Sequence, residues 1–331
     1  MSYHDKRKNI VSSGLPEEVS RLQSIVKTVL DYEFECDKWE RVADMTMMRD
    51  CFSVAVGNGK LFAVGGLDTK IVECLDLKNA GAEWKRVART TVTRRSLGVA
   101  VGDGKLFAVG GITLKKDIER RVGRKIFLNT VEYLDLKNLG AGWKRVAGMT
   151  VKRHWHGVAV GDGKLFAVGG YNGGSLKTVE CLDLKNVGAG WKRVADMTVA
   201  RRSLGVAVGD GKLFAVGGYD GSNGLNSVEY LDLKNLGAGW KRVAGMTVKR
   251  HWHGVAVGDG KLFAVGGYNG GSLKTVEYLD LKNVGAGWKR VADMTVARDD
   301  HGVAVGDGKL FAVGGNGGIA GKNVECLQIR Y

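Results

Sequence analysis

The chain has 331 residues, of which 44% are hydrophobic and 26% charged, and its formal net charge is +15. It contains no apolar run long enough to cross a bilayer, and no cleavable apolar segment follows the basic N-terminus, so we expect a cytoplasmic protein without membrane attachment. The five cysteines lie far apart and form neither a disulfide framework nor a CxxC metal pattern, which fits a reducing compartment.

The first 37 residues are expected to form a separate N-terminal segment, a basic tail followed by an amphipathic helix. Pro16 stands near the first helical position, and Glu17 and Glu18 lie in the first turn. Apolar side chains then follow one stripe: Val19, Leu22, Ile25, Val26, Val29 and Leu30. We expect this helix to pack on the rim of the following domain, and a helix for a partner or for self-association is the alternative.

Residues 38–331 form the second expected domain and repeat one unit. The phrase GVAVGDGKLFAVGG occurs five times without change, starting at Gly98, Gly157, Gly205, Gly254 and Gly302, and SVAVGNGKLFAVGG starts at Ser53. Each phrase ends in a double glycine with a structural role: Gly65 and Gly66, Gly110 and Gly111, Gly169 and Gly170, Gly217 and Gly218, Gly266 and Gly267, Gly314 and Gly315. Their spacings of 45, 59, 48, 49 and 48 residues give a period near 50, which is typical of a propeller blade.

Each unit predicts four short strands. In the unit that begins at Gly254 these are residues 254–258, 261–267, 275–282 and 288–294. The GDG sequence between the first two supplies the positive φ of a tight hairpin. The first two strands are apolar on both sides, which favours sheets that stack on one another. The same unit carries a net charge of +2, so repetition explains most of the basic charge and makes a nucleic-acid partner unlikely.

The unit closely resembles the kelch repeat. LFAVGG is followed by a spaced aromatic pair, such as Tyr230 and Trp240. The tryptophan recurs in every unit, at Trp39, Trp84, Trp143, Trp191, Trp240 and Trp288, and we expect a structural role for it. Cys74, Cys181 and Cys326 occupy the first aromatic slot in three units. Residues 131–201 match residues 228–298 except that Cys181 stands in place of Tyr278, which indicates that Cys181 is a packing residue. The resemblance implies an all-β, six-bladed propeller, although the prolines that the family often has after the third and fourth strands are absent here.

The order of the strands predicts how the ring closes. The domain begins with a fourth strand, Trp39–Met45, and ends after a third strand. We therefore expect Trp39–Met45 to complete the sixth blade and to join the two ends of the domain.

One arginine and one glutamate recur in every unit. The arginine precedes the first strand, at Arg49, Arg94, Arg153, Arg201, Arg250 and Arg298, and the glutamate lies in the third, at Glu73, Glu132, Glu180, Glu229, Glu277 and Glu325. We expect a repeated ion pair within the blade, and a functional ring of arginines is the alternative.

Variation concentrates on one face, formed by the loops after the second strands and those before the first strands; we call it the variable face. Blades 2 to 5 place basic and aromatic residues there: Arg95, His154, Trp155, His156, Arg202, His251, Trp252 and His253. The long loop of blade 2 adds Lys115, Lys116, Arg120, Arg121, Arg124 and Lys125. Blades 6 and 1 place acidic residues there: Asp50, Asp299 and Asp300. The alternative is that the tryptophans pack under loops and the loop charges are solvated.

These residues predict a non-enzymatic module that binds a protein segment, because tryptophan and arginine often carry interface energy and arginine pairs with carboxylates or phosphates. We expect an acidic segment and a monomeric propeller without a cofactor. The resemblance implies a role as a substrate-recognition or scaffold subunit of a ubiquitin-ligase-type complex. The alternatives are an enzyme or lectin-like site at the channel mouth and an actin-binding scaffold. Two HxH pairs, whose rings should lie on one side of a strand, and the neighbouring aspartates raise a metal site as a further, less favoured alternative.

Overall fold

The computed structural model describes residues 21, 38–66, 69–79, 81–115, 124–316 and 318–329. The chain divides into two compact units, Met1–Lys38 and Trp39–Tyr331. The expected N-terminal helix and three residues of the long loop, Lys116, Arg120 and Arg121, lie outside the described residues. Among the residues that the structure describes, no helix has the length and apolar character needed to span a membrane.

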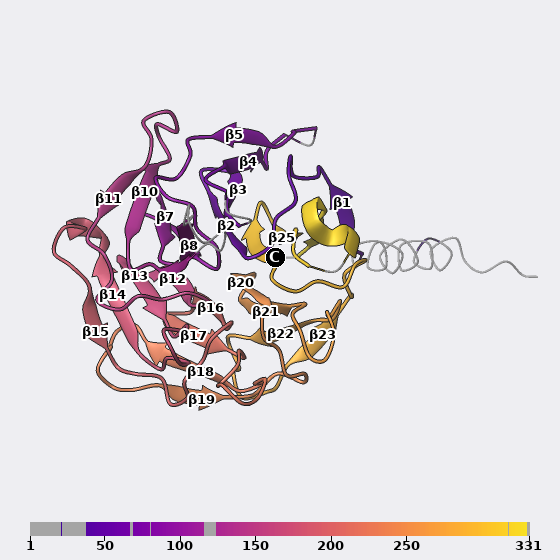
Figure 1. The fold of residues 1–331 in the computed structure, drawn as a ribbon. Helices are drawn as coiled ribbons and strands as arrows, with labels where there is room; N and C mark the ends of the chain where they lie inside the picture. Colours follow the sequence, from indigo (N-terminus) through magenta and orange to yellow (C-terminus); the bar gives the residue numbers. More distant parts are fainter. Residues whose placement is uncertain are drawn as a thin grey trace, which may run out of the picture. The chain divides into compact units, whose positions relative to one another are not determined.

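The second unit is all-β and consists of six four-stranded antiparallel sheets arranged around a centre (Figure 1). Blade 1 contains β2 (Phe52–Gly57), β3 (Lys60–Gly65), β4 (Val72–Asp76) and β5 (Lys85–Val87). Blade 2 contains β6 (Gly98–Gly102), β7 (Lys105–Val109), β10 (Val131–Asp135) and β11 (Lys144–Val146). Blade 3 contains β12 (Gly157–Gly161), β13 (Lys164–Val168), β14 (Val179–Asp183) and β15 (Lys192–Val194).

Blades 4 to 6 repeat this order. Blade 4 contains β16 (Gly205–Gly209), β17 (Lys212–Val216), β18 (Val228–Asp232) and β19 (Lys241–Val243). Blade 5 contains β20 (Gly254–Gly258), β21 (Lys261–Val265), β22 (Val276–Asp280) and β23 (Lys289–Val291). Blade 6 contains β24 (Gly302–Gly306), β25 (Lys309–Val313), β26 (Val324–Gln328) and β1 (Glu40–Val42). Two short 3-10 helices, Leu184–Asn186 and Gly318–Lys322, and the hairpin of β8 (Ile112–Lys115) and β9 (Arg124–Phe127) lie in connections.

The ring closes as the sequence predicted. Strand β1 pairs antiparallel with β26, with Glu40 opposite Cys326 and Val42 opposite Val324. The amide of Met45 also donates to the carbonyl of Lys322 at 2.9 Å. The first strand of the domain thus completes the last blade.

Glycines allow the inner strands of neighbouring blades to approach one another closely. In blade 2, a Cβ added to Gly98 would lie 2.0 Å from Cγ2 of Val158 in blade 3, and the same clash recurs at the start of β12, β16 and β20. The hairpin between β6 and β7 turns at Asp103 and Gly104, with φ of 49° and 67°, as a type I′ turn requires. Both features follow from the repeated GVAVGDGK sequence.

The hydrophobic core lies between blades. Each of six core clusters joins two neighbouring sheets; one of them brings together Phe166 and Cys181 of blade 3 with Leu213 and Leu231 of blade 4. Cys181 is buried in this cluster, and burial raises the pKa of its thiol. The cysteine therefore acts as a packing residue, which agrees with its place in an aromatic slot.

The six blade tryptophans link neighbouring blades into a closed cycle. Each indole Nε1–H donates to the carbonyl that follows the outer strand of the preceding blade, at 2.9–3.0 Å: Trp39 to Ala292, Trp84 to Ala43, Trp143 to Ala88, Trp191 to Ala147, Trp240 to Ala195 and Trp288 to Ala244. Because Trp39 and Ala43 belong to the β1 segment, the cycle passes through the closing strand.

Candidate functional site

The repeated arginines are buried struts. In blade 4, Arg201 Nε donates to Glu229 at 3.1 Å, and its Nη1 donates to the carbonyls of Gly217 and Ser227. All six arginines are at most 1% exposed, and each pairs with the glutamate of its own blade. The expected ion pair is therefore present. A functional arginine ring is excluded, because a ligand cannot reach side chains that are already buried and paired.

One residue per blade lies around the central channel with a left-handed backbone. We call these six residues the axial ring: Cys51, Ser96, Trp155, Ser203, Trp252 and Asp300, with φ between 50° and 53°. Backbone hydrogen bonds of 2.7–3.0 Å join successive members, from the amide of each residue to the carbonyl of the member before it, from Ser96 to Asp300. This belt of backbone hydrogen bonds holds a conformation that non-glycine residues adopt at a cost in free energy.

The expectation that each HxH pair places its imidazoles on one side of a strand was wrong. Trp155 lies between His154 and His156 and has a left-handed φ, and strand β12 begins only at Gly157. His154 packs against the rings of Phe127 and Tyr171, whereas His156 is buried against the preceding blade near Gly98. The sequence HWH in blade 5 repeats the arrangement, with a left-handed Trp252 before β20.

The buried histidines are neutral at physiological pH. Burial, together with the positive charges of Arg153 and Arg298, lowers the pKa of His156 and of His301 to about 3. Burial and the nearby Lys125 lower the pKa of His154 to about 4. Among the described residues of the variable face, the positive charge therefore comes from arginine and lysine. No group of three His, Cys, Asp or Glu residues within the described ranges is placed to hold a metal ion.

A groove of about 400 Å³ on the variable face collects several of the predicted residues. Its cations are Arg95, Lys125 and Arg202, and its aromatic walls are Phe127, Trp155 and Tyr171. Arg202 lies over three rings, with Cζ 4.8 Å from the centroid of Tyr219, 5.1 Å from Tyr171 and 6.0 Å from Trp155. Arg95 comes within 4.0 Å of the carboxylate of Asp50.

Some predicted residues contribute differently from the expectation. His156 and His253 are buried beneath the face, at 6% exposure each, and cannot offer their rings to a partner. Arg124 lies opposite Lys115 in the β8–β9 hairpin, whose strands extend the groove. The sequence reasoning did not single out Phe127, Tyr171 and Tyr219; the tyrosine that follows the double glycine in blades 3 and 4 was the available signal.

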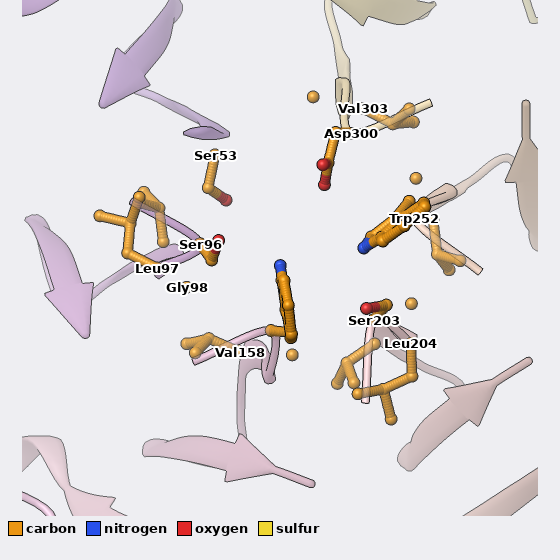
Figure 2. A pocket seen from close by; sticks show the side chains of 18 of the residues that line it. Ser53, Ser96, Leu97, Gly98, Val158, Ser203, Leu204, Trp252, Asp300 and Val303 are labelled. Atoms are coloured by element: carbon orange, nitrogen blue, oxygen red, sulfur yellow. The ribbon is translucent and has the colours of Figure 1, made fainter. Parts of the chain in front are cut away.

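The acidic side of the face is also built. Asp299 is 5% exposed, accepts from the hydroxyl of Ser272 at 2.6 Å and from the amide of Asn316 at 3.2 Å. Its neighbour Asp300 points into the central channel (Figure 2). The two aspartates therefore have different roles. Asp299 joins two loops by hydrogen bonds, and Asp300 belongs to the axial ring.

Six four-stranded sheets that close around an axial channel define a six-bladed β-propeller. The family model of the Kelch motif matches residues 152–198, 200–247 and 249–295. The chain therefore contains three Kelch motifs, which the repeated sequence predicted.

Comparisons with other known proteins add the fold. Among 1087 matching chains of solved structures is one described as the structure of YjhT, which is 16% identical. The match covers 86% of this chain and 95% of that chain with a TM-score of 0.72, and at this identity the likeness shows the fold alone. No curated protein matches the sequence significantly.

Proposed function

We propose that this propeller is a non-enzymatic module that binds an acidic protein segment on its variable face. Kelch propellers generally serve as protein-interaction modules, which supports the class. The groove between Arg95 and Arg202 supports the chemistry of the ligand. It is the single feature on which the proposal depends.

The lining of the groove is complementary to a carboxylate-bearing segment. Three cations line it, and none of its described lining residues is acidic. The ring faces of Trp155 and Tyr171 offer apolar area beside the guanidinium of Arg202. Arginine and aromatic side chains in a concave site are the residue types that most often dominate interface energies. An arginine next to aromatic faces also pairs with carboxylates in a fixed geometry.

The proposal is tested by capture followed by affinity measurement. Partners retained by the immobilised protein at moderate salt are identified, and their segments are synthesised as peptides. We expect an acidic peptide to bind, and Arg95→Ala with Arg202→Ala to weaken its Kd at least about tenfold, since each lost charged contact is worth on the order of 1 kcal/mol. Higher salt should weaken the wild-type complex as well.

The chain offers a matched control. Arg145→Ala with Arg242→Ala removes the same charge from exposed outer strands, β11 and β19, of the same two blades. We expect this control to bind the peptide as the wild type does. Equal weakening in both double variants would attribute the effect to net charge. Wild-type affinity in the groove variant would exclude the groove as the binding site.

The wider role follows from this contact. We propose that the propeller acts as a monomer in the cytoplasm and supplies the recognition or scaffold surface of a larger complex, such as one of the ubiquitin-ligase type. In such a complex another subunit would contact the ligase, and the groove would select the client. A client found by the capture experiment should then lose ubiquitylation when Arg95 and Arg202 are replaced together.

A further inference from the structure

The axial ring directs its side chains into a cavity of about 190 Å³ at the mouth of the channel. Figure 2 shows the hydroxyls of Ser96 and Ser203, the indole nitrogen of Trp252 and the carboxyl oxygens of Asp300 turned toward one central space. The backbone belt fixes the six Cα positions independently of the side chains they carry. The ring therefore presents a preorganised set of polar groups, which lowers the entropy cost of binding.

Two tryptophans in this ring differ from the six blade tryptophans. Every blade tryptophan donates its Nε1–H to a carbonyl, whereas Nε1 of Trp155 and Nε1 of Trp252 are buried and have no hydrogen-bond partner in the described chain. A buried donor without a partner is costly, and an indole N–H can only donate. Two such donors in one cavity call for a ligand that brings acceptor atoms.

The charges around the cavity are few. Among its described lining residues Asp300 is the one Asp, Glu, Lys or Arg, and the histidines that line it are neutral, since burial lowers the pKa of His253 as well as those of His156 and His301. The remaining polar groups are the hydroxyls of Ser53, Ser96 and Ser203 and the thiol of Cys51. Burial, with the help of Asp300 and Asp50, raises the pKa of that thiol to about 12, so it stays protonated.

We propose that the axial cavity binds a carboxylate, held by the indole N–H groups of Trp155 and Trp252 and by the serine hydroxyls. The volume suits a group of acetate size, and hydrogen-bond donors in a water-poor site stabilise an anion without a paired cation. This site lies on the channel axis, and the arginine groove is a separate cavity beside it; Cys51, Ser96 and Trp155 border both.

Asp300 makes the site sensitive to pH. Burial is the main cause that raises the pKa of its carboxyl to about 7. Asp299 and Asp50 add to this rise, whereas the hydrogen bond from Cys51 at 3.3 Å and the charge of Arg95 oppose it. When protonated, Asp300 can donate its O–H to the ligand; when ionised, it repels a carboxylate. If the protonated form alone binds, the apparent Kd at pH 8.5 is weaker than at pH 6 by about 30-fold, the inverse of the protonated fraction.

The carboxylate could come from two sources. It could be a free small molecule, or it could be the tip of an acidic side chain on the segment bound in the neighbouring groove, and only this second source rests on the proposed function. Sodium acetate probes the first source. The peptide acetyl-Gly-Glu-Gly-amide probes the second, with acetamide and acetyl-Gly-Gln-Gly-amide as neutral controls of the same size.

The indole N–H signals report binding directly. The chain has eight tryptophans, so a proton–nitrogen correlation spectrum of the full chain should show eight indole signals. Trp155→Phe and Trp252→Phe assign the two axial signals, and the other six show that each variant is folded. At pH 6 we expect acetate, the Glu peptide or both to shift the two axial signals, while the six blade signals and both neutral controls stay unchanged.

The outcomes separate the possibilities. Acetate alone indicates a small-molecule site, the Glu peptide alone indicates a side-chain socket, and both together indicate a site open to either. Asp300→Asn should retain the shift at pH 8.5, where the wild type loses it. Axial signals that respond to neither probe overturn the proposal, and so does movement of all eight signals together. These spectra need no captured partner. A positive or a negative result for the axial cavity therefore does not decide whether the arginine groove binds an acidic segment, which the affinity measurement tests separately.

Discussion

Three blades carry a buried histidine where the other three carry an apolar residue. His156, His253 and His301 occupy the blade position of Leu97, Leu204 and Phe52, and both ring nitrogens of each histidine are buried without a hydrogen-bond partner among the described residues. Burial favours the neutral ring in the folded state, while the unfolded chain titrates near the usual value for histidine. The folded protein should therefore lose stability as the pH falls below about 6.5 toward the lowered pKa values.

His156→Leu tests this at a position where the chain itself uses leucine. The variant should gain roughly 1–3 kcal/mol of unfolding free energy at neutral pH, because it removes two buried, unpaired polar atoms. It should also lose less stability in acid than the wild type. Urea unfolding at several pH values measures both effects, with exposed Lys192→Leu as the control for added hydrophobicity. An unchanged or reduced stability would mean that the imidazole makes contacts that leucine cannot replace.

At the residue scale the sequence predicted the repeated roles and missed the local exceptions. Arg201 and Glu229 could be paired because every unit repeats both residues. The left-handed backbone of the axial ring could not be predicted, because Cys, Ser and Trp carry none of the signals that glycine gives, and Asp, which tolerates this conformation better, stands at one place of the ring. That conformation is imposed by hydrogen bonds between blades, which no single unit contains. Because this conformation at Trp155 and Trp252 was not expected, the two imidazole rings of each HxH pair were predicted on one side of a strand.

At the scale of elements, the closing strand β1 is the part of the ring whose loss would open it. Strand β1 has three residues, Glu40–Val42. A hydrogen bond from the indole of Trp39 precedes it, and a hydrogen bond from the backbone amide of Met45 follows it. Its removal would leave β26 as an unpaired edge and would uncover the core that Trp39 shares with blade 5.

Deletion of residues 1–45 should lower the Tm markedly relative to deletion of residues 1–37, which retains β1 and Trp39. The difference measures the closing strand itself, because both variants lack the same upstream segment. Differential scanning calorimetry gives the two Tm values. Equal melting of the two variants would show that the pairing of β1 with β26 contributes nothing to stability.

The order of the strands was readable from the sequence, but the fourth strand was expected to be longer than it is: residues 288–294 were expected in blade 5, and the strand comprises Lys289–Val291. The four strands of each unit, and their assignment to blades, follow from the spacing of GVAVG, LFAVGG and the blade tryptophan. The long connection in blade 2 was read as a charged loop, whereas the structure has paired strands at its two ends, β8 and β9. No repeat covers this insertion, so the chain offered no internal copy with which to compare it.

At the scale of the whole molecule, none of the six blades has a hydrophobic core of its own. Each core cluster contains residues of two neighbouring blades, and the cycle of indole bonds and the axial belt join the same neighbours again. In an open array of repeats, the ends can unfold before the middle. A closed ring has no end, so local opening of one blade exposes the cores on both of its sides.

The propeller should therefore unfold in one transition despite its nearly identical repeats. The calorimetric enthalpy should equal the van't Hoff enthalpy, and circular dichroism and tryptophan fluorescence should give one midpoint. The chain without residues 1–45 serves as the comparison, since its ring is open and its transition should broaden. Two resolved transitions in the wild type would show that groups of blades are independent.

The axial ring separates the identity of a side chain from the architecture that carries it. Its six places hold four residue types, yet φ differs by only a few degrees from one place to the next. The reason is that the blades share the belt of backbone hydrogen bonds and the glycine-rich strands behind it. Substitutions at these places can therefore change what the channel recognises while the fold stays the same. Each blade thus contributes one variable side chain to the channel on a backbone that all six blades share. A duplicated blade that acquires a substitution at this place changes the lining of the channel without a change of fold.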